Sequence, residues 1–183
     1  MKILAIADMD DIHWNGGYGG ADLLVSCGDV ADQVILQAAE AYGCREIFAV
    51  KGNHDSAIPF TSPIFDLHLQ VTECCGLTFG GFNGCWKYKP KGHFLYTQQE
   101  AEDLLRDFPR VDVLVTHNSP HDVHDRPDNV HIGFDALNAY IRRAKPRLLI
   151  HGHQHVTVDT DLNGTRVHGV YGHEVIELEV MQG

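Results

Sequence analysis

The chain has 183 residues, of which 44% are hydrophobic, and this length allows one domain with a sizeable core. Its 25 acidic residues outnumber the 14 lysines and arginines, and the formal net charge of −11 argues against a broad nucleic-acid-binding face. The five cysteines form no CxxC pair, and the N-terminal apolar run is too short for a secretion signal or a membrane span. We therefore expect a single domain over residues 1–183 in the reducing cytoplasm, with no membrane partner and with the oligomeric state left open.

The first part of the chain alternates strand and helix patterns. Residues 2–7 and 22–27 are apolar on both faces, which is typical of strands buried inside a sheet. Residues 31–42 carry apolar side chains at helical spacing, and Gly43 marks the end of that helix. Residues 46–50 return to a strand pattern, so this part of the chain favours an α/β arrangement.

The middle of the chain has a different character. The runs 66–72 and 77–82 alternate around a short turn, which predicts a β-hairpin. Residues 87–92 form a basic loop with the only local concentration of lysine. The sequence Thr-Gln-Gln-Glu that begins at Thr97 is a capping box, and it predicts a helix that ends near residue 108.

The last part of the chain repeats the α/β pattern and then becomes rich in strand signals. Residues 111–115 and 148–150 are apolar strand patterns, and residues 133–144 have helical spacing. Between them, the long loop 118–131 carries histidines that face either a substrate or solvent. The tail 156–180 alternates around an Asn-Gly pair, which is the strongest short signal for a β-hairpin.

Residues able to bind a metal follow several of the apolar runs. They are Asp8, Gly28-Asp29, Gly52-Asn53-His54-Asp55, His117 and Gly152-His153-Gln154-His155. A lone Gly-Asn-His-Asp is more often a turn than a site, but the repetition at successive strand ends favours a site, because binding sites form where such ends meet. The mixture of oxygen and imidazole ligands suits two divalent transition ions, such as Mn²⁺, Fe²⁺, Ni²⁺ or Zn²⁺, better than Mg²⁺ alone.

The order of these motifs resembles that of the calcineurin-like metallophosphoesterase superfamily, whose pattern is DxH, GDxx, GNH(D/E), H and GHxH. The resemblance covers residues 2–155. It implies an α/β fold, a four-layer αββα sandwich in which two mixed β-sheets are flanked by helices. It also implies a metal-dependent enzyme that hydrolyses a small phosphate ester, with Mn²⁺ as the first expectation for the two ions and Fe, Ni or Zn as alternatives.

The resemblance also assigns roles to individual residues. The metal ligands would be Asp8 and His155 on the first ion, Asp29 bridging both ions, and Asn53, His117 and His153 on the second ion. A hydroxide that bridges the ions would attack phosphorus, and His54 would be the catalytic histidine that assists the departing oxygen. Asp55 would orient His54, since a carboxylate commonly fixes the tautomer of an imidazole.

The chain departs from the family pattern in two places. Measured from Asp8, the histidine of the first motif is replaced by Asp10. The triplet Asp11-Ile12-His13 spells that motif literally but lies beyond the apolar run, so we favour Asp10 as the ligand and keep His13 as a loop or substrate-side residue. A carboxylate in place of an imidazole makes a weaker Lewis acid. The second departure is the glycine-rich loop 14–20, where many relatives carry a helix, and this loop could leave the site unusually open.

Two classes of function remain open on the sequence. The protein phosphatase signature requires GDxxDRG and GNHE, whereas here no arginine follows Asp32 and the tetrad ends in Asp55. This favours an enzyme for small phosphodiesters or nucleotides over a protein phosphatase, with a phosphodiesterase as the first expectation and the preference for diester or monoester left open. A nuclease lacks support because the short acidic chain has no added DNA-binding region. The other class is a non-catalytic scaffold of the same fold, like the phosphoesterase-fold subunit of retromer. Such scaffolds lose the catalytic histidine, whereas His54 is present, but Asp10 keeps this alternative open.

Overall fold

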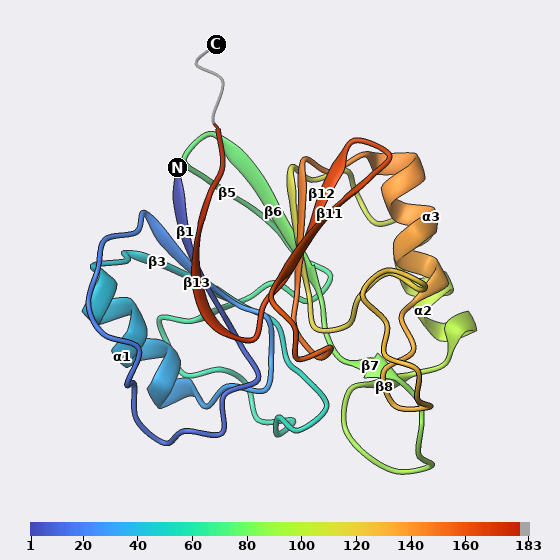
Figure 1. Cartoon of the computed structure of the whole chain (residues 1–183), viewed down its shortest axis with the longest axis horizontal. Helices are drawn as coiled ribbons and strands as arrows, with labels where there is room; N and C mark the ends of the chain where they lie inside the picture. Colours follow the sequence, from blue (N-terminus) through green and yellow to red (C-terminus); the bar gives the residue numbers. More distant parts are fainter. Residues whose placement is uncertain (180–183) are drawn as a thin grey trace.

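Two β-sheets form the centre of the molecule (Figure 1), which is described by a computed structural model over residues 1–179. The predicted tail ends at residue 180 and the predicted domain at residue 183, so residues 180–183 of both lie outside this description. The first sheet has the order β13 (Gly172–Glu177), β1 (Lys2–Ala7), β2 (Leu23–Ser26), β3 (Glu46–Ala49) and β4 (Phe65–Asp66). The second sheet has the order β11 (Val158–Leu162), β12 (Thr165–Gly169), β10 (Leu148–His151), β9 (Val113–Thr116), β6 (Leu77–Phe82) and β5 (Val71–Cys74). A short pair, β7 (Cys85–Trp86) and β8 (Leu95–Tyr96), lies apart from both.

The helices cover the outer faces of the two sheets (Figure 1). The helix α1 (Asp32–Tyr42) lies on the first sheet, while α2 (Gln98–Leu105) and α3 (Asp135–Ala144) lie on the second. The alternation along β1 shows how the layers arise, because Ile3 packs in the core between the sheets and its neighbour Leu4 packs in the core under α1. The predicted αββα sandwich of two mixed sheets is therefore confirmed.

Local signals in the sequence account for several element ends. The helix α1 is followed by Gly43, whose φ of 69° is left-handed and suits glycine. Thr97 and Glu100 form both hydrogen bonds of the predicted capping box at the start of α2. Asn163 and Gly164 both have positive φ in the turn between β11 and β12, as a tight hairpin requires. Among residues 1–179, no helix has both the length and the apolar character needed to cross a membrane.

Several predicted boundaries are wrong in part. The hairpin forms between β5 and β6, but its first strand begins only at Val71, and residues 65–66 instead join the first sheet as β4, parallel to β3. The helix predicted to reach residue 108 ends at Leu105, and the helix predicted from residue 133 begins at Asp135. Alternation cannot say which sheet a short strand will join, and here the aromatic contact of Phe65 with Phe48, at 6.0 Å between ring centroids, accompanies its place beside β3.

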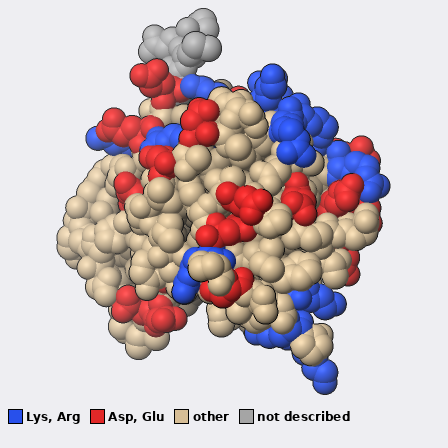
Figure 2. All heavy atoms as spheres, turned by 45° about the vertical axis from the view of Figure 1, so that its right-hand side comes forward, with Lys and Arg blue, Asp and Glu red and all other residues tan. Residues whose placement is uncertain are grey.

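Charged side chains are mixed on the face seen in Figure 2. Lysines and arginines gather there in separate groups, and acidic side chains lie between these groups. That face therefore offers no continuous basic surface of the kind that nucleic-acid binding requires.

Candidate metal centre

The candidate site forms where the carboxyl ends of strands from both sheets meet. Asp8 and Asp29 follow β1 and β2 and have left-handed φ values of 53° and 55°, which turn the chain out of the sheet. Asn53 follows β3 after Gly52, where a Cβ atom would lie 2.1 Å from Oδ1 of Asp29. Only glycine therefore allows these two loops to approach each other so closely.

His117, which follows β9, is completely buried at the centre of the site. Its Nδ1 lies 2.8 Å from the carbonyl oxygen of Cys27. Because a carbonyl only accepts, Nδ1 carries the hydrogen. The other ring nitrogen, Nε2, lies 3.0 Å from Oδ1 of Asn53 and 3.4 Å from Oδ2 of Asp29, and both of those oxygens are acceptors. Such a meeting of acceptor atoms requires positive charge, which either a proton or a metal ion can supply.

The pKa shifts of His117 and Asp29 also indicate that this site favours positive charge. Burial is the largest single influence on His117 and opposes its protonation, but the charge of Asp29, the hydrogen bond with it and the charge of Asp8 together outweigh burial and raise the pKa of His117 to about 9. Burial would likewise raise the pKa of Asp29, but the charge of His117 and the hydrogen bond with it lower that pKa to about 2. Asp8, Asp29 and His117 each offer a ligand atom within 4.8 Å of the others.

Asp8 supplies a second sign of a cation site. Its side chain is only 4% exposed, and its Oδ2 accepts a hydrogen bond of 2.8 Å from the backbone N–H of His153. Within residues 1–179, its Oδ1 is buried without any hydrogen-bond partner, and burial raises the pKa of this carboxyl to about 6. An unpaired buried carboxylate oxygen is costly, so this donor set fits a divalent cation.

His153 and His155 bring the end of β10 to the same place. Nε2 of His153 lies 3.2 Å from the carbonyl oxygen of Val130 and donates to it, so Nδ1 is the ring nitrogen left for a metal. Burial lowers the pKa of His153 to about 2, which keeps the ring in the neutral form that binds metals. Nε2 of His155 lies 3.6 Å from Oδ1 of Asp8, and its ring stacks on Tyr171.

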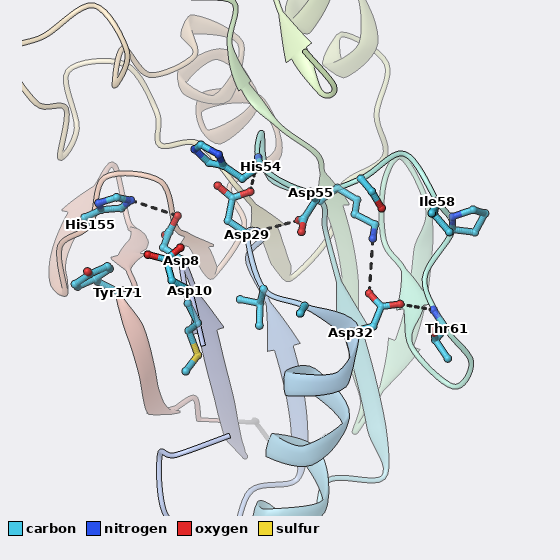
Figure 3. A pocket seen from close by; sticks show the side chains of 16 residues that line it. Asp8, Asp10, Asp29, Asp32, His54, Asp55, Ile58, Thr61, His155 and Tyr171 are labelled. Atoms are coloured by element: carbon cyan, nitrogen blue, oxygen red, sulfur yellow. Dashed lines mark hydrogen bonds and ion pairs between the residues drawn. The ribbon is translucent and has the colours of Figure 1, made fainter. Parts of the chain in front are cut away.

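The remaining predicted residues lie around this core. His54 is exposed, lies beside Asp29 in Figure 3, and its backbone N–H donates to Oδ1 of Asp29 at 2.8 Å. Asp55 uses its Oδ2 to accept hydrogen bonds from the backbone N–H groups of Gly52 and Asp29, at 2.7 and 2.9 Å. Among the described residues, Asp55 makes no hydrogen bond with His54, so no contact supports the predicted role of Asp55 in orienting His54. The carboxylate instead ties two ligand loops together.

A cavity of about 740 Å³ opens beside these residues (Figure 3). Asp10 lines it together with Asp8, whereas His13 is exposed and does not line it. The structure therefore brings Asp10 rather than His13 to the site. No residue of the loop 14–20 lines the cavity either. That loop lies against α1, where the backbone N–H of Trp14 donates to Oε1 of Gln37 at 2.8 Å.

Sequence reasoning missed several residues that shape the site. The hydroxyl of Tyr88 accepts a hydrogen bond of 3.3 Å from Nδ2 of Asn53, and the only signal for it was its place in the basic loop. Tyr171 and Lys51 line the cavity, and no sequence motif marks them. His151 lies with its Nδ1 2.8 Å from the carbonyl oxygen of Gly152 and thereby supports the loop of the last motif.

The fold and the site together define a candidate centre for divalent metal ions, at the facing strand ends of an αββα sandwich. The family model for calcineurin-like phosphoesterases matches residues 1–157, and the chain belongs to this family. Membership implies metal-dependent hydrolysis of phosphate esters.

Several solved structures are similar to this chain in fold. The phosphopantetheinyl hydrolase PptH from Mycobacterium tuberculosis superposes with a TM-score of 0.63 at 15% identity, covering 93% of this chain and 89% of that one. The protein TT1561 of Thermus thermophilus has a TM-score of 0.57 at 14% identity, with coverage of 93% and 89%. Vps29 from Entamoeba histolytica has a TM-score of 0.49 at 16% identity, with coverage of 94% and 74%, a likeness too weak to argue from. Comparison with curated proteins gave no significant match. At these identities the likeness shows the fold alone.

Proposed function

We propose that this protein is a phosphodiesterase that hydrolyses a small phosphodiester with the help of two divalent ions, of which Mn²⁺ is the first choice. The observation that carries the proposal is the meeting of acceptor atoms on His117, Asn53 and Asp29 beside a buried oxygen of Asp8 that has no hydrogen-bond partner within residues 1–179. This arrangement borders a cavity large enough for a small organic substrate. The five free cysteines are consistent with our expectation of a reducing cytoplasm.

The ligands separate into two groups that share Asp29. Asp8 and His155 lie on one side, and Asp10 lines the cavity beside them. Asn53 and His117 lie on the other side, and the ring of His153 is 4.9 Å from that of His117. Divalent ions held in these groups would supply a water that ionises near neutral pH and positive charge against the charge that develops on the phosphoryl oxygens.

His54 is the residue that we assign to proton transfer. In hydrolysis, the oxygen of water forms a new bond to phosphorus, the ester P–O bond breaks, and the departing alkoxide takes up a proton. The imidazole of His54 is exposed at the cavity, where it can donate that proton or stabilise the charge on the departing oxygen. We assign Asp55 to positioning, because its carboxylate holds the backbone of Gly52 and Asp29.

The experiment that tests this function compares bis(p-nitrophenyl) phosphate with p-nitrophenyl phosphate. Chelated protein is reloaded in turn with Mn²⁺, Ni²⁺, Zn²⁺ and Mg²⁺, and its folding is verified by circular dichroism. Metal-dependent turnover that prefers the diester supports a phosphodiesterase, and a preference for the monoester moves the protein to the phosphatases. No turnover with any metal overturns the enzyme and leaves the scaffold as the function.

Two variants separate chemistry from metal binding. His54→Ala is expected to keep its metal while losing turnover by about 10²- to 10⁴-fold, the usual contribution of a general acid. Asp29→Ala is expected to lose metal, which elemental analysis of the purified protein measures directly. Equal metal content and equal activity in both variants would remove the assigned roles.

A further inference from the structure

The cavity extends to both sides of the metal ligands. Figure 3 places Tyr171 beside His155 at one end and Ile58 near Thr61 at the opposite end, with Asp29 and His54 between them. Its volume of about 740 Å³ falls within the range of about 300–1,000 Å³ typical of pockets that enclose whole small molecules. A phosphate group alone would leave both ends of this cavity unfilled.

Tyr171 provides a flat apolar surface at one end. Its ring stacks on that of His155, with centroids 5.1 Å apart and planes inclined by 22°, and the residue still has 53% of its surface exposed. Its backbone N–H donates to Oγ1 of Thr157 at 3.3 Å, which fixes this short segment before β13. An exposed aromatic ring held next to a metal ligand is suited to stack on a flat group of a bound substrate.

Ile58 lies at the other end of the cavity, in a segment that is fixed by several contacts, and is 71% exposed. Asp32 accepts a hydrogen bond of 2.7 Å from the backbone N–H of Thr61 and lies 3.7 Å from Nζ of Lys51. That Nζ lies 3.6 Å from the centroid of the Phe60 ring, and Lys51 is only 6% exposed. A partly buried ion pair, a backbone hydrogen bond and a cation–π contact therefore hold this segment, so Ile58 has a defined place at the cavity.

The charges around the cavity restrict what its two ends can accept. Within residues 1–179, Lys51 is the only lysine or arginine that lines it, and its ammonium is engaged by Asp32 and Phe60. The other ionisable side chains that line it, apart from Tyr171, are aspartates and the two histidines His54 and His155. Neither end offers a free cation for a second phosphate, so both ends suit uncharged groups.

We propose that the cavity has two substrate arms, one at Tyr171 and one at Ile58, and that the substrate is a phosphodiester with an uncharged ester group in each arm. The group in the Tyr171 arm is flat and aromatic, and the group in the Ile58 arm packs against that apolar side chain. This inference rests on the proposed phosphodiesterase activity, because it names the class of diester that the same site accepts.

The test compares bis(p-nitrophenyl) phosphate with methyl p-nitrophenyl phosphate, since both release p-nitrophenol but only the first has a second aromatic group. Tyr171→Ala is expected to lower the ratio of the two kcat/KM values by about 5- to 10-fold, as loss of one stacking contact does, while Tyr171→Phe keeps it. Ile58→Ala is expected to lower kcat/KM for both diesters by about 3- to 10-fold. Matched controls are Tyr18→Ala and Leu104→Ala, because these exposed residues do not line the cavity.

A binding measurement makes the test independent of turnover. Calorimetric titration of Mn²⁺-loaded protein with phenyl phosphate and with methyl phosphate should show tighter binding of the phenyl compound, and Tyr171→Ala should abolish that preference. If the wild-type enzyme is active but Tyr171→Ala changes neither the ratio of kcat/KM values nor the preference for phenyl phosphate, the proposal of two substrate arms is refuted. The proposed phosphodiesterase activity is not affected by that result. An inactive wild-type protein overturns the proposed function, and the titration then still decides whether Tyr171 recognises an aromatic group.

Discussion

The hydrogen bonds of Asp55 lead to a prediction about how the site is held together. Its Oδ2 accepts from the backbone N–H of Gly52 at 2.7 Å and from that of Asp29 at 2.9 Å, so one carboxylate oxygen joins the loops after β2 and β3. Asp55→Ala removes both acceptors and leaves two N–H groups unpaired. Asp55→Asn keeps a neutral acceptor oxygen of the same shape in the same place.

The expected loss of stability follows from these two contacts. A hydrogen bond to a charged group contributes about 1.5–3 kcal/mol, and we take the lower value for each bond because Asp55 is only half-buried and one oxygen serves both donors. Asp55→Ala should therefore lower the free energy of unfolding by about 3 kcal/mol, which for a domain of this size corresponds to a fall in Tm of about 6–12 °C. Asp55→Asn should lose about half of that, since bonds to neutral acceptors are roughly half as strong.

The assay is thermal unfolding of the chelated protein, so that bound metal does not contribute to Tm. Wild type, Asp55→Ala and Asp55→Asn are compared, and Mn²⁺ affinity is then measured by titration. Wild-type stability in Asp55→Ala, or equal losses in both variants, would refute the bridging role. Normal stability of Asp55→Asn combined with a large loss of turnover would instead restore the role predicted from the sequence, in which Asp55 orients His54.

Three other changes test separate parts of the structure. Tyr88→Phe removes the acceptor for Nδ2 of Asn53 and should weaken Mn²⁺ binding about 10-fold, and an unchanged titration would refute the contact. Gly152→Ala would place a Cβ atom 2.7 Å from Oδ2 of Asp8, so the folded variant should contain less metal by elemental analysis. Asp159→Asn should lower the free energy of unfolding by about 0.5–1 kcal/mol at neutral pH. Hydrogen bonds from Arg166 lower the pKa of Asp159 from 3.8 to about 2, so the difference from wild type in denaturant unfolding should be full above about pH 5 and narrow as the pH falls towards 2.

The order of the layers and the direction of the ligand loops can be predicted from the sequence, because both follow from local patterns. Burial on both faces of β1 and β2 identifies strands inside a sheet, and parallel strands place Asp8 and Asp29 at the same edge. His117 is placed in the same way by β9, although nothing local shows that the second sheet will bring it to the carbonyl of Cys27.

The contacts that local patterns do not encode join distant segments. Lys51 reads as a surface residue from its type, yet it is buried because Asp32 and Phe60 converge on it from other segments. The family pattern assigned Asp55 to the histidine beside it, whereas the closest donors are backbone N–H groups that only the folded chain places there. Tyr171 likewise carries no motif, because its importance arises from the ring of His155 against which it stacks.

The backbone at the site explains why the ligands need the whole fold to hold them. Asp8, Asp29, His153 and His155 all have positive φ, between 52° and 63°. For residues with a Cβ atom this left-handed conformation costs on the order of 1 kcal/mol each, so four such residues oppose folding by about 4 kcal/mol, which is a sizeable part of the usual stability of a domain. The strands that precede them and the hydrogen bonds of Asp8 and Asp29 must hold this geometry before any ion binds. The sequence shows which residues can bind metal, but the strain shows that the fold is built to present them together.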